Sequence, residues 1–186
     1  MLSEDKLENL TLQHGGEYSV NHTKRILKIV SIIGANYQYN REIVTLAAYL
    51  HDWGAYPPLA IKGIDHAQRS ADIAIEFLGT EKYDSRDINH VAECIKYHHI
   101  GDQNKSIEAK LLSDADGIDF VGIIGVIRNF TTRPNELKKA YNASRTRMQT
   151  VIENICLKES QNLINHRIER MNDFFKHFDE ETFGIY

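Results

Sequence analysis

The chain has 186 residues, 42% of them hydrophobic, and a formal net charge of -4 at pH 7. This length fits one domain, and the charge disfavours a nucleic acid polymer as partner, because binding along a phosphate backbone needs a basic surface. The sequence starts with acidic residues and has no run of about 18 apolar residues, so we expect a cytoplasmic protein without a membrane partner. Cys94 and Cys156 lie far apart on apolar faces of predicted helices, which indicates reduced thiols.

Apolar residues recur at helical spacing along most of the chain, and the two-residue alternation of strands is rare. An all-α fold is therefore predicted. A short helix covers residues 3–13, with Ser3 as its cap, and a glycine pair at 15–16 breaks it. A longer helix covers about residues 18–35, and His22 lies on its apolar stripe. A histidine thus continues the face that this helix buries.

The third predicted helix covers about residues 40–51, and its buried face ends in His51. Asp52 follows directly, so a histidine and an aspartate stand side by side where the helix gives way to a loop. Two adjacent metal ligands at a helix end pack poorly but form half of a metal site. Residues 54–66 contain two prolines and no regular pattern, which predicts a mobile lid that influences substrate choice.

Two further predicted helices also carry histidines on their apolar faces. One runs over residues 66–79 and begins with His66. The other covers about residues 84–99, and His98 follows its last inward isoleucine by three residues. Both histidines therefore continue a buried stripe, as His22 and His51 do.

The second half of the chain begins with a polar turn at residues 101–105, after which Ser106 is predicted to cap a helix. Asp116 lies on the inward face of that helix. Residues 118–127 are apolar almost all round, which predicts a helix buried in the middle of the bundle.

Two long helices are predicted at the end of the chain. Pro134 is placed as the first residue of a helix that reaches about Leu157, and Ser160 is predicted to cap the last one, whose inward stripe reaches Phe178. Neither carries an obvious chemical motif. Because we find no internal repeat and no linker, the sequence predicts a single domain.

Six polar residues share a position on, or at the end of, these apolar stripes. Helices that bury their stripes against one another bring the polar residues together near one end of the bundle. One buried histidine usually donates to a backbone carbonyl, but a whole cluster without a cation would cost several kcal/mol of desolvation. A divalent metal removes this cost, so the set predicts a metal site. The six are His22, His51, Asp52, His66, His98 and Asp116.

This pattern resembles the HD superfamily of metal-dependent phosphohydrolases, in which a histidine, a His-Asp pair and a distant aspartate follow one another. The segments His66-Ala67-Gln68-Arg69-Ser70-Ala71 and Ile95-Lys96-Tyr97-His98 extend the likeness to the bacterial branch of small HD hydrolases related to YedJ and YpgQ. The resemblance implies one HD-type helical bundle over residues 1–186. Its motif-bearing core is about residues 18–130, and helices at about 134–180 pack on that core.

The resemblance also implies roles for individual residues. The metal ligands would be His22, His51, Asp52 and Asp116. Asp116 is preferred to Asp114 because Ala115-Asp116-Gly117-Ile118 aligns with the family's Ala-Asp-basic-Leu form, although Gly117 replaces the basic residue. Asp114 is then an outer partner of the site. Relatives with two metals add histidines between the His-Asp pair and the last aspartate, where His66, His98 and His99 stand. One or two ions are thus expected, with Asp52 as the bridging carboxylate of a pair.

The resulting hypothesis is hydrolysis of a phosphoester or phosphoanhydride bond with a divalent ion (Mn, Mg, Fe, Ni or Co). The resemblance implies a phosphorylated small molecule, a nucleotide, as substrate, and it leaves a homodimer open. Asp52, His66 and His98 would act in catalysis. Three basic residues would contact the substrate phosphate: Lys62, Arg69 and Arg128. The ordinary alternative for each of them is a solvated charge on the surface.

Two alternatives come from other functional classes. Some HD proteins with two irons oxidise a C–H bond, and the extra histidines are compatible with such an oxygenase. A non-catalytic nucleotide-binding module is the other alternative. The sequence argues against that module, because no ligand of the basic pattern has been lost.

Overall fold

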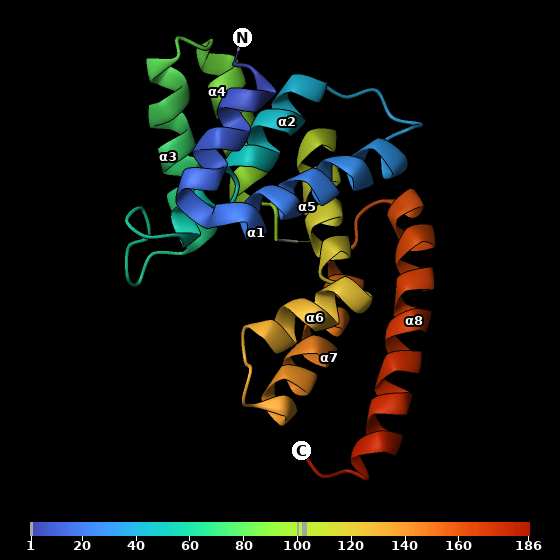
Figure 1. The fold of residues 1–186 in the computed structure, drawn as a ribbon. Coiled ribbons are helices and arrows are strands. Elements are labelled where there is room, and N and C mark those ends of the chain that lie inside the picture. The colour runs from blue at the N-terminus through green and yellow to red at the C-terminus, as the bar shows by residue number, and fades with distance from the viewer. Residues whose placement is uncertain (1, 100, 102–103) are drawn as a thin grey trace.

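The computed structural model describes residues 2–99, 101 and 104–186. Within these residues the chain forms eight α-helices and one short 3-10 helix, without a strand (Figure 1). The all-α fold predicted from apolar spacing is therefore confirmed. Among the described helices, none combines the length and the apolar character needed to cross a membrane.

The first half of the chain contains four α-helices and the 3-10 helix η1. Their bounds are α1 Glu4–Ile33, α2 Arg41–Leu50, η1 Trp53–Ala55, α3 His66–Thr80 and α4 Ser85–Lys96. α1 bends at Gly16, whose φ of 67° and ψ of -170° are not helical, so the predicted break is confirmed as a kink. The predicted Ser3 cap is also confirmed, because its side chain accepts a hydrogen bond from the Lys6 backbone amide.

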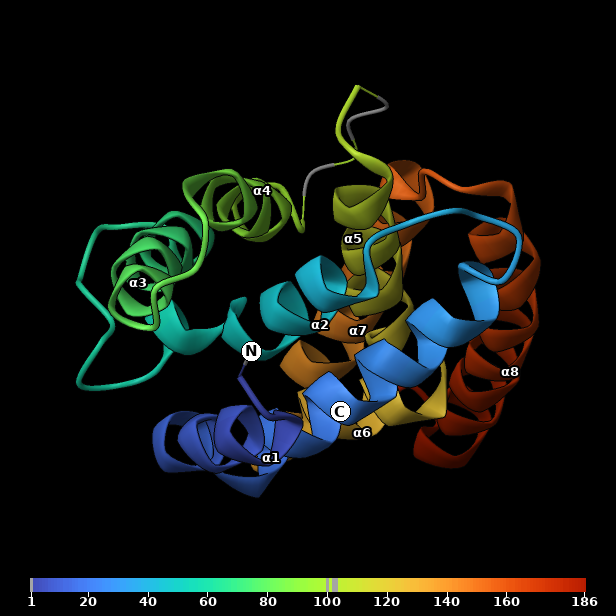
Figure 2. The same ribbon diagram turned by 90° about the horizontal axis from the view of Figure 1, so that it is seen from above.

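The second half contains four more helices. They are α5 Ile107–Asp119, α6 Ile123–Thr131, α7 Leu137–Asn154 and α8 Lys158–Thr182. Ser106 caps α5 as predicted, since its side chain accepts from the Ala109 amide. α5 contacts α1, α2, α4, α7 and α8, and it lies between the N-terminal helices and the α7–α8 pair (Figures 1 and 2). Side chains on α5 can therefore contact residues from most of the other helices.

The prediction of one buried helix over residues 118–127 is wrong. α5 ends at Asp119, and α6 begins only after Gly122, whose φ of 97° turns the chain. Gly125 packs so closely on the end of α5 that a Cβ there would lie 1.9 Å from the Phe120 carbonyl oxygen. One face of α6 meets the bundle, while Ile123, Ile124 and Ile127 on the other face are 41 to 51% exposed.

Three helix ends differ from their predictions. Pro134 lies in a turn, because α7 starts only at Leu137. Ser160 lies inside α8, which begins at Lys158, and so it is not the cap. α4 ends at Lys96, which places His98 in the following turn instead of on the helix. The predicted polar turn at 101–105 lies partly outside the described residues.

The segment 54–66 is irregular beyond η1, and two hydrogen bonds fasten it to α3. The Gly54 amide donates to Ser70 Oγ over 2.8 Å, and Arg69 Nε donates to the Leu59 carbonyl over 2.9 Å. Its mobility as a lid stays a prediction.

Candidate metal centre

Four side chains from three helical segments converge at one end of α5. His22 comes from α1, His51 and Asp52 follow the last turn of α2, and Asp116 comes from α5. His22 Nε2 lies 3.0 Å from Asp116 Oδ1 and 4.0 Å from Asp52 Oδ2. His51 Nε2 lies 3.4 Å from Asp52 Oδ2 and 3.9 Å from Asp116 Oδ1. Two imidazoles and two carboxylates thus face a common point.

Three of the facing atoms are buried and have no hydrogen-bond partner: Nε2 of His22, Nε2 of His51 and Oδ1 of Asp116. The opposite ring nitrogens are engaged, since His51 Nδ1 contacts the Ala48 carbonyl at 2.8 Å and His22 Nδ1 contacts Asp119 at 2.7 Å. A proton on each Nδ1 leaves the Nε2 lone pair directed at the shared point. Imidazole nitrogen and carboxylate oxygen atoms that converge without hydrogen bonds are suitable ligands for a first-row divalent ion, so this donor set fits such an ion.

The two carboxylates of the centre are held in the ionised form. Burial works to raise the pKa of Asp116, but the contact with His22 and the nearby imidazoles outweigh it, and the pKa is lowered. The pKa of Asp52 is also lowered, because the charge of His51 opposes the effect of burial. Burial disfavours protonation of His22, yet its contacts with Asp116 and Asp119 raise its pKa overall. Protons and a metal ion therefore compete for the same site.

Asp119 borders the candidate centre, and the sequence interpretation gave it no role. Its carboxylate contacts His22 Nδ1 at 2.7 Å and accepts from Arg25 Nε at 2.7 Å and from Arg128 Nη1 at 2.6 Å. Burial opposes ionisation, but the hydrogen bonds from His22 and Arg25 lower the pKa of Asp119 to about 2. Its position three residues after Asp116, on the same face of α5, is the signal that could have found it.

Replacing Asp119 with Asn is expected to lower the affinity for Mn²⁺ about 10- to 100-fold, because outer partners that orient a histidine ligand have effects of that size. Titration calorimetry on metal-free protein measures this change. The control is D173N, which alters an exposed carboxylate on α8. An unchanged Mn²⁺ affinity in D119N would show that Asp119 does not orient His22.

A second group of histidines adjoins the first. One ring nitrogen from each of His66, His98 and His99 lies within 4.8 Å of the others. His66 Nε2 is 3.7 Å from Asp52 Oδ1, whereas the other Asp52 oxygen faces the first group. His98 Nδ1 contacts the Ile95 carbonyl at 2.6 Å, which leaves its Nε2 free to bind. Asp52 therefore lies between two sets of nitrogen donors.

Asp114 faces away from this centre. Its two carboxylate oxygens accept hydrogen bonds from the backbone amides of Cys156 and Leu157, at 2.9 and 2.8 Å. Those amides lie in the connection between α7 and α8, so Asp114 fastens the start of α8 to α5.

The three basic residues predicted to contact phosphate have different surroundings. Lys62 is exposed in the 54–66 segment. Arg69 donates to the Leu59 carbonyl, as described above. Arg128 is buried, donates from Nε to the Tyr18 hydroxyl over 2.7 Å and is ion-paired with the Asp119 carboxylate. The charge of Arg128 is thus already matched by a carboxylate of the protein.

Fold and site together define a class of proteins: an all-α bundle whose helices gather buried histidines and aspartates into a centre suited to a divalent ion. Within that class, the model of the HD domain family matches residues 20–120, which is more than half of the chain. The chain belongs to the HD domain family.

The fold is similar to several solved structures. A predicted HD superfamily hydrolase from an uncultured Thermotogales bacterium is 22% identical with a TM-score of 0.70, over 95% of this chain and 91% of that one. Bacillus subtilis YpgQ in complex with ADP is 20% identical with a TM-score of 0.73, over 96% and 97%. An HD-superfamily hydrolase from Bacillus thuringiensis is 20% identical with a TM-score of 0.73, over 96% and 95%.

No curated protein sequence matches the chain significantly. At identities of 20 to 22% the structural likeness establishes the fold alone. Membership of the HD family adds general support for a metal-dependent phosphohydrolase, without fixing the substrate or the ion.

Proposed function

We propose that this protein uses a divalent metal to hydrolyse a phosphoester or phosphoanhydride bond of a nucleotide. The observation that carries the proposal is the convergence of three buried donor atoms that form no hydrogen bond, on His22, His51 and Asp116, beside the Asp52 carboxylate. Gathering two imidazoles and two carboxylates at one buried point is costly for a core that only needs packing, because each buried polar group without a hydrogen bond costs about 1–3 kcal/mol.

The four ligands would be His22, His51, Asp52 and Asp116, as the resemblance implied. When bound, a divalent ion supplies a Lewis acid that activates water and offsets the charge of a phosphoryl group. The chain orients the ligands through the Nδ1 contacts of its histidines, described above, and keeps both carboxylates ionised. These features prepare the donor set before the ion binds.

His98 is suited to bind an ion as a neutral imidazole. Burial, followed by the charge of His51, lowers the pKa of His98 to about 4, so it is neutral at pH 7. Its Nδ1 contacts the Ile95 carbonyl, so the free lone pair is on Nε2. A neutral imidazole with this tautomer accepts at Nε2 and does not donate there.

A nucleotide is proposed as substrate on two grounds. The resemblance to small HD hydrolases implies one, and Bacillus subtilis YpgQ was solved in complex with ADP. The test combines metal analysis of protein purified without chelator with a turnover screen of nucleoside mono-, di- and triphosphates in Mn²⁺. Release of phosphate or pyrophosphate is expected. Iron-dependent O₂ consumption without either product would favour the oxygenase, and nucleotide that binds but stays intact would favour the binding module.

We further propose that two ions bind, with Asp52 between them. The double variant H98A/H99A is expected to reduce the metal content from about two ions per chain to about one, because it removes two of the three histidines in the second group. Elemental analysis of dialysed protein measures the ratio. H166A, which changes an exposed histidine on α8, is the control. A single ion in the unaltered protein would exclude the second site.

A further inference from the structure

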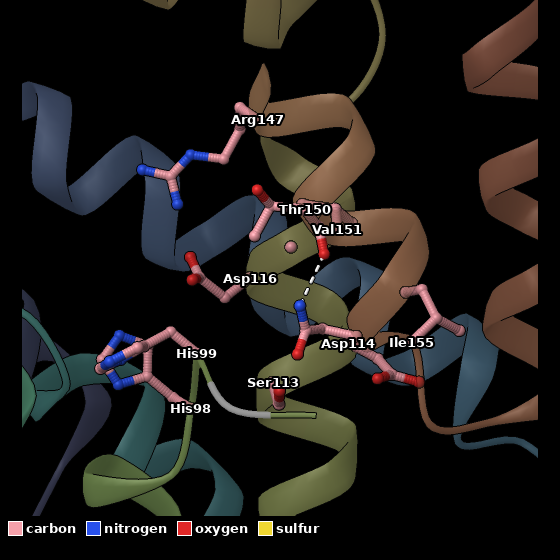
Figure 3. Close-up of a pocket in the computed structure, with 11 residues that line it drawn as sticks. His98, His99, Ser113, Asp114, Asp116, Arg147, Thr150, Val151 and Ile155 are labelled. Atoms are coloured by element: carbon pink, nitrogen blue, oxygen red, sulfur yellow. Dashed lines mark hydrogen bonds between the residues drawn. The ribbon is translucent and has the colours of Figure 1, made fainter. Parts of the chain in front are cut away.

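A pocket adjoins the metal centre on the side of α7. Its lining includes His98, His99 and Asp116 from the centre and Arg147 and Thr150 from α7. In the view of Figure 3, Asp116 separates Arg147 from the two histidines, and the Arg147 side chain extends from α7 toward the Asp116 side of the pocket. α7 lies beyond residues 20–120, so the family match does not cover this wall of the pocket.

The Arg147 side chain is held by an aromatic ring that also borders the metal centre. Its guanidinium carbon lies 4.5 Å from the centroid of the Phe120 ring, and that of Arg128 lies 4.0 Å from the same ring. The Phe120 ring contacts His22 edge-on, with centroids 5.5 Å apart. Cation–π contacts of this kind contribute about 0.5–2 kcal/mol, enough to favour one placement of a long side chain. Phe120 thus ties the position of Arg147 to that of a proposed ligand.

The arginines around Phe120 and Asp119 differ in whether a carboxylate of the protein neutralises their charge. Arg25 and Arg128 both bind the Asp119 carboxylate. Arg147 forms no ion pair or hydrogen bond with a carboxylate anywhere in the described part of the chain, although it lines a pocket that also contains Asp116. A guanidinium beside a metal centre without an internal counterion is available to an anion from outside.

We propose that Arg147 is a substrate-binding residue that contacts the phosphate chain of an anionic substrate, at a phosphoryl group next to the one that is cleaved. The inference rests on the proposed phosphohydrolase function and names the part of the substrate that α7 recognises. A guanidinium offers two parallel N–H donors to phosphate oxygens, which favours a di- or triphosphate over a neutral ligand. His99, exposed on the opposite side of the pocket, borders the same space.

Arg145 provides a matched control two residues earlier on α7. It is also exposed, but its Nη1 donates to the Tyr141 hydroxyl over 3.0 Å and its guanidinium lies over the Phe175 ring. Residues two apart on a helix point to nearly opposite faces, and Arg145 does not line the pocket. The two arginines therefore share charge, helix and exposure, but not position.

The experiment titrates methylenediphosphonate, a pyrophosphate analogue that resists hydrolysis, into the metal-loaded full-length protein by calorimetry. R147Q is expected to weaken binding about 10- to 100-fold, the effect of losing charged hydrogen bonds. R147K, which keeps the charge but loses the paired donors, is expected to weaken it about 3- to 10-fold. R145Q is expected to bind like the unaltered protein. Metal content, measured before and after titration, should be equal in all four proteins.

Three results would overturn the inference: no binding to the unaltered protein, unchanged binding by R147Q, or equal weakening by R147Q and R145Q. If R147Q does not fold, R147K decides the question, since its binding must still fall. Failure of the proposed function gives a different result. Protein that binds the analogue through Arg147 but hydrolyses no nucleotide contradicts hydrolysis and leaves the anion site in place.

Discussion

Replacing Asp52 with Ala is expected to abolish both metal retention and turnover. Its two oxygens face different nitrogen donors, Oδ2 toward His51 at 3.4 Å and Oδ1 toward His66 at 3.7 Å. Loss of an outer partner alone lowers metal affinity about 10- to 100-fold, so loss of this carboxylate should exceed 100-fold. Elemental analysis after dialysis and the nucleotide screen in added Mn²⁺ measure the two effects.

The control for D52A is D173A, which removes an exposed carboxylate and should retain metal and turnover. Circular dichroism checks that both variants keep their helical content. A D52A protein that keeps its metal, or that keeps turnover, would contradict the site proposed here.

Asp114 and Asp116 are expected to respond in opposite ways to substitution, although they lie two residues apart. D116N should lose the metal, because Asp116 Oδ1 is a buried atom of the centre without a hydrogen bond and the substitution removes its charge. D114A should keep the metal but lose about 1–3 kcal/mol of unfolding free energy, since it strands the amides of Cys156 and Leu157. The helical period places the two side chains on different faces of α5.

Metal content and chemical denaturation of both variants separate these roles. Without metal, D116N is expected to be nearly as stable as the metal-free unaltered protein. This comparison controls for unfolding as a cause of metal loss. Loss of metal from D114A together with full metal in D116N would reverse the assignment. The family motif alone chose Asp116 by alignment, whereas the hydrogen bonds to Asp114 give a physical reason for the choice.

The helical spacing was informative wherever a helix buries one stripe. It placed His22 on α1 and Asp116 on α5. Residue types identified the break near Gly16 and the Ser106 cap, because those features depend on neighbours a few residues away. It failed at residues 118–127, where apolar residues suggested burial. There, a glycine of positive φ starts a new helix whose outer face no other described element covers.

The sequence by itself determined the all-α class, most helix faces and the set of histidines and aspartates that could meet. The tertiary structure decided what each of them meets. Asp119 joins Arg25 across 94 positions of the chain, and Arg147 approaches the centre only because α7 packs on α5. Local periodicity reports which face of a helix is buried, but the crossing of helices distant in sequence decides which side chains share a pocket.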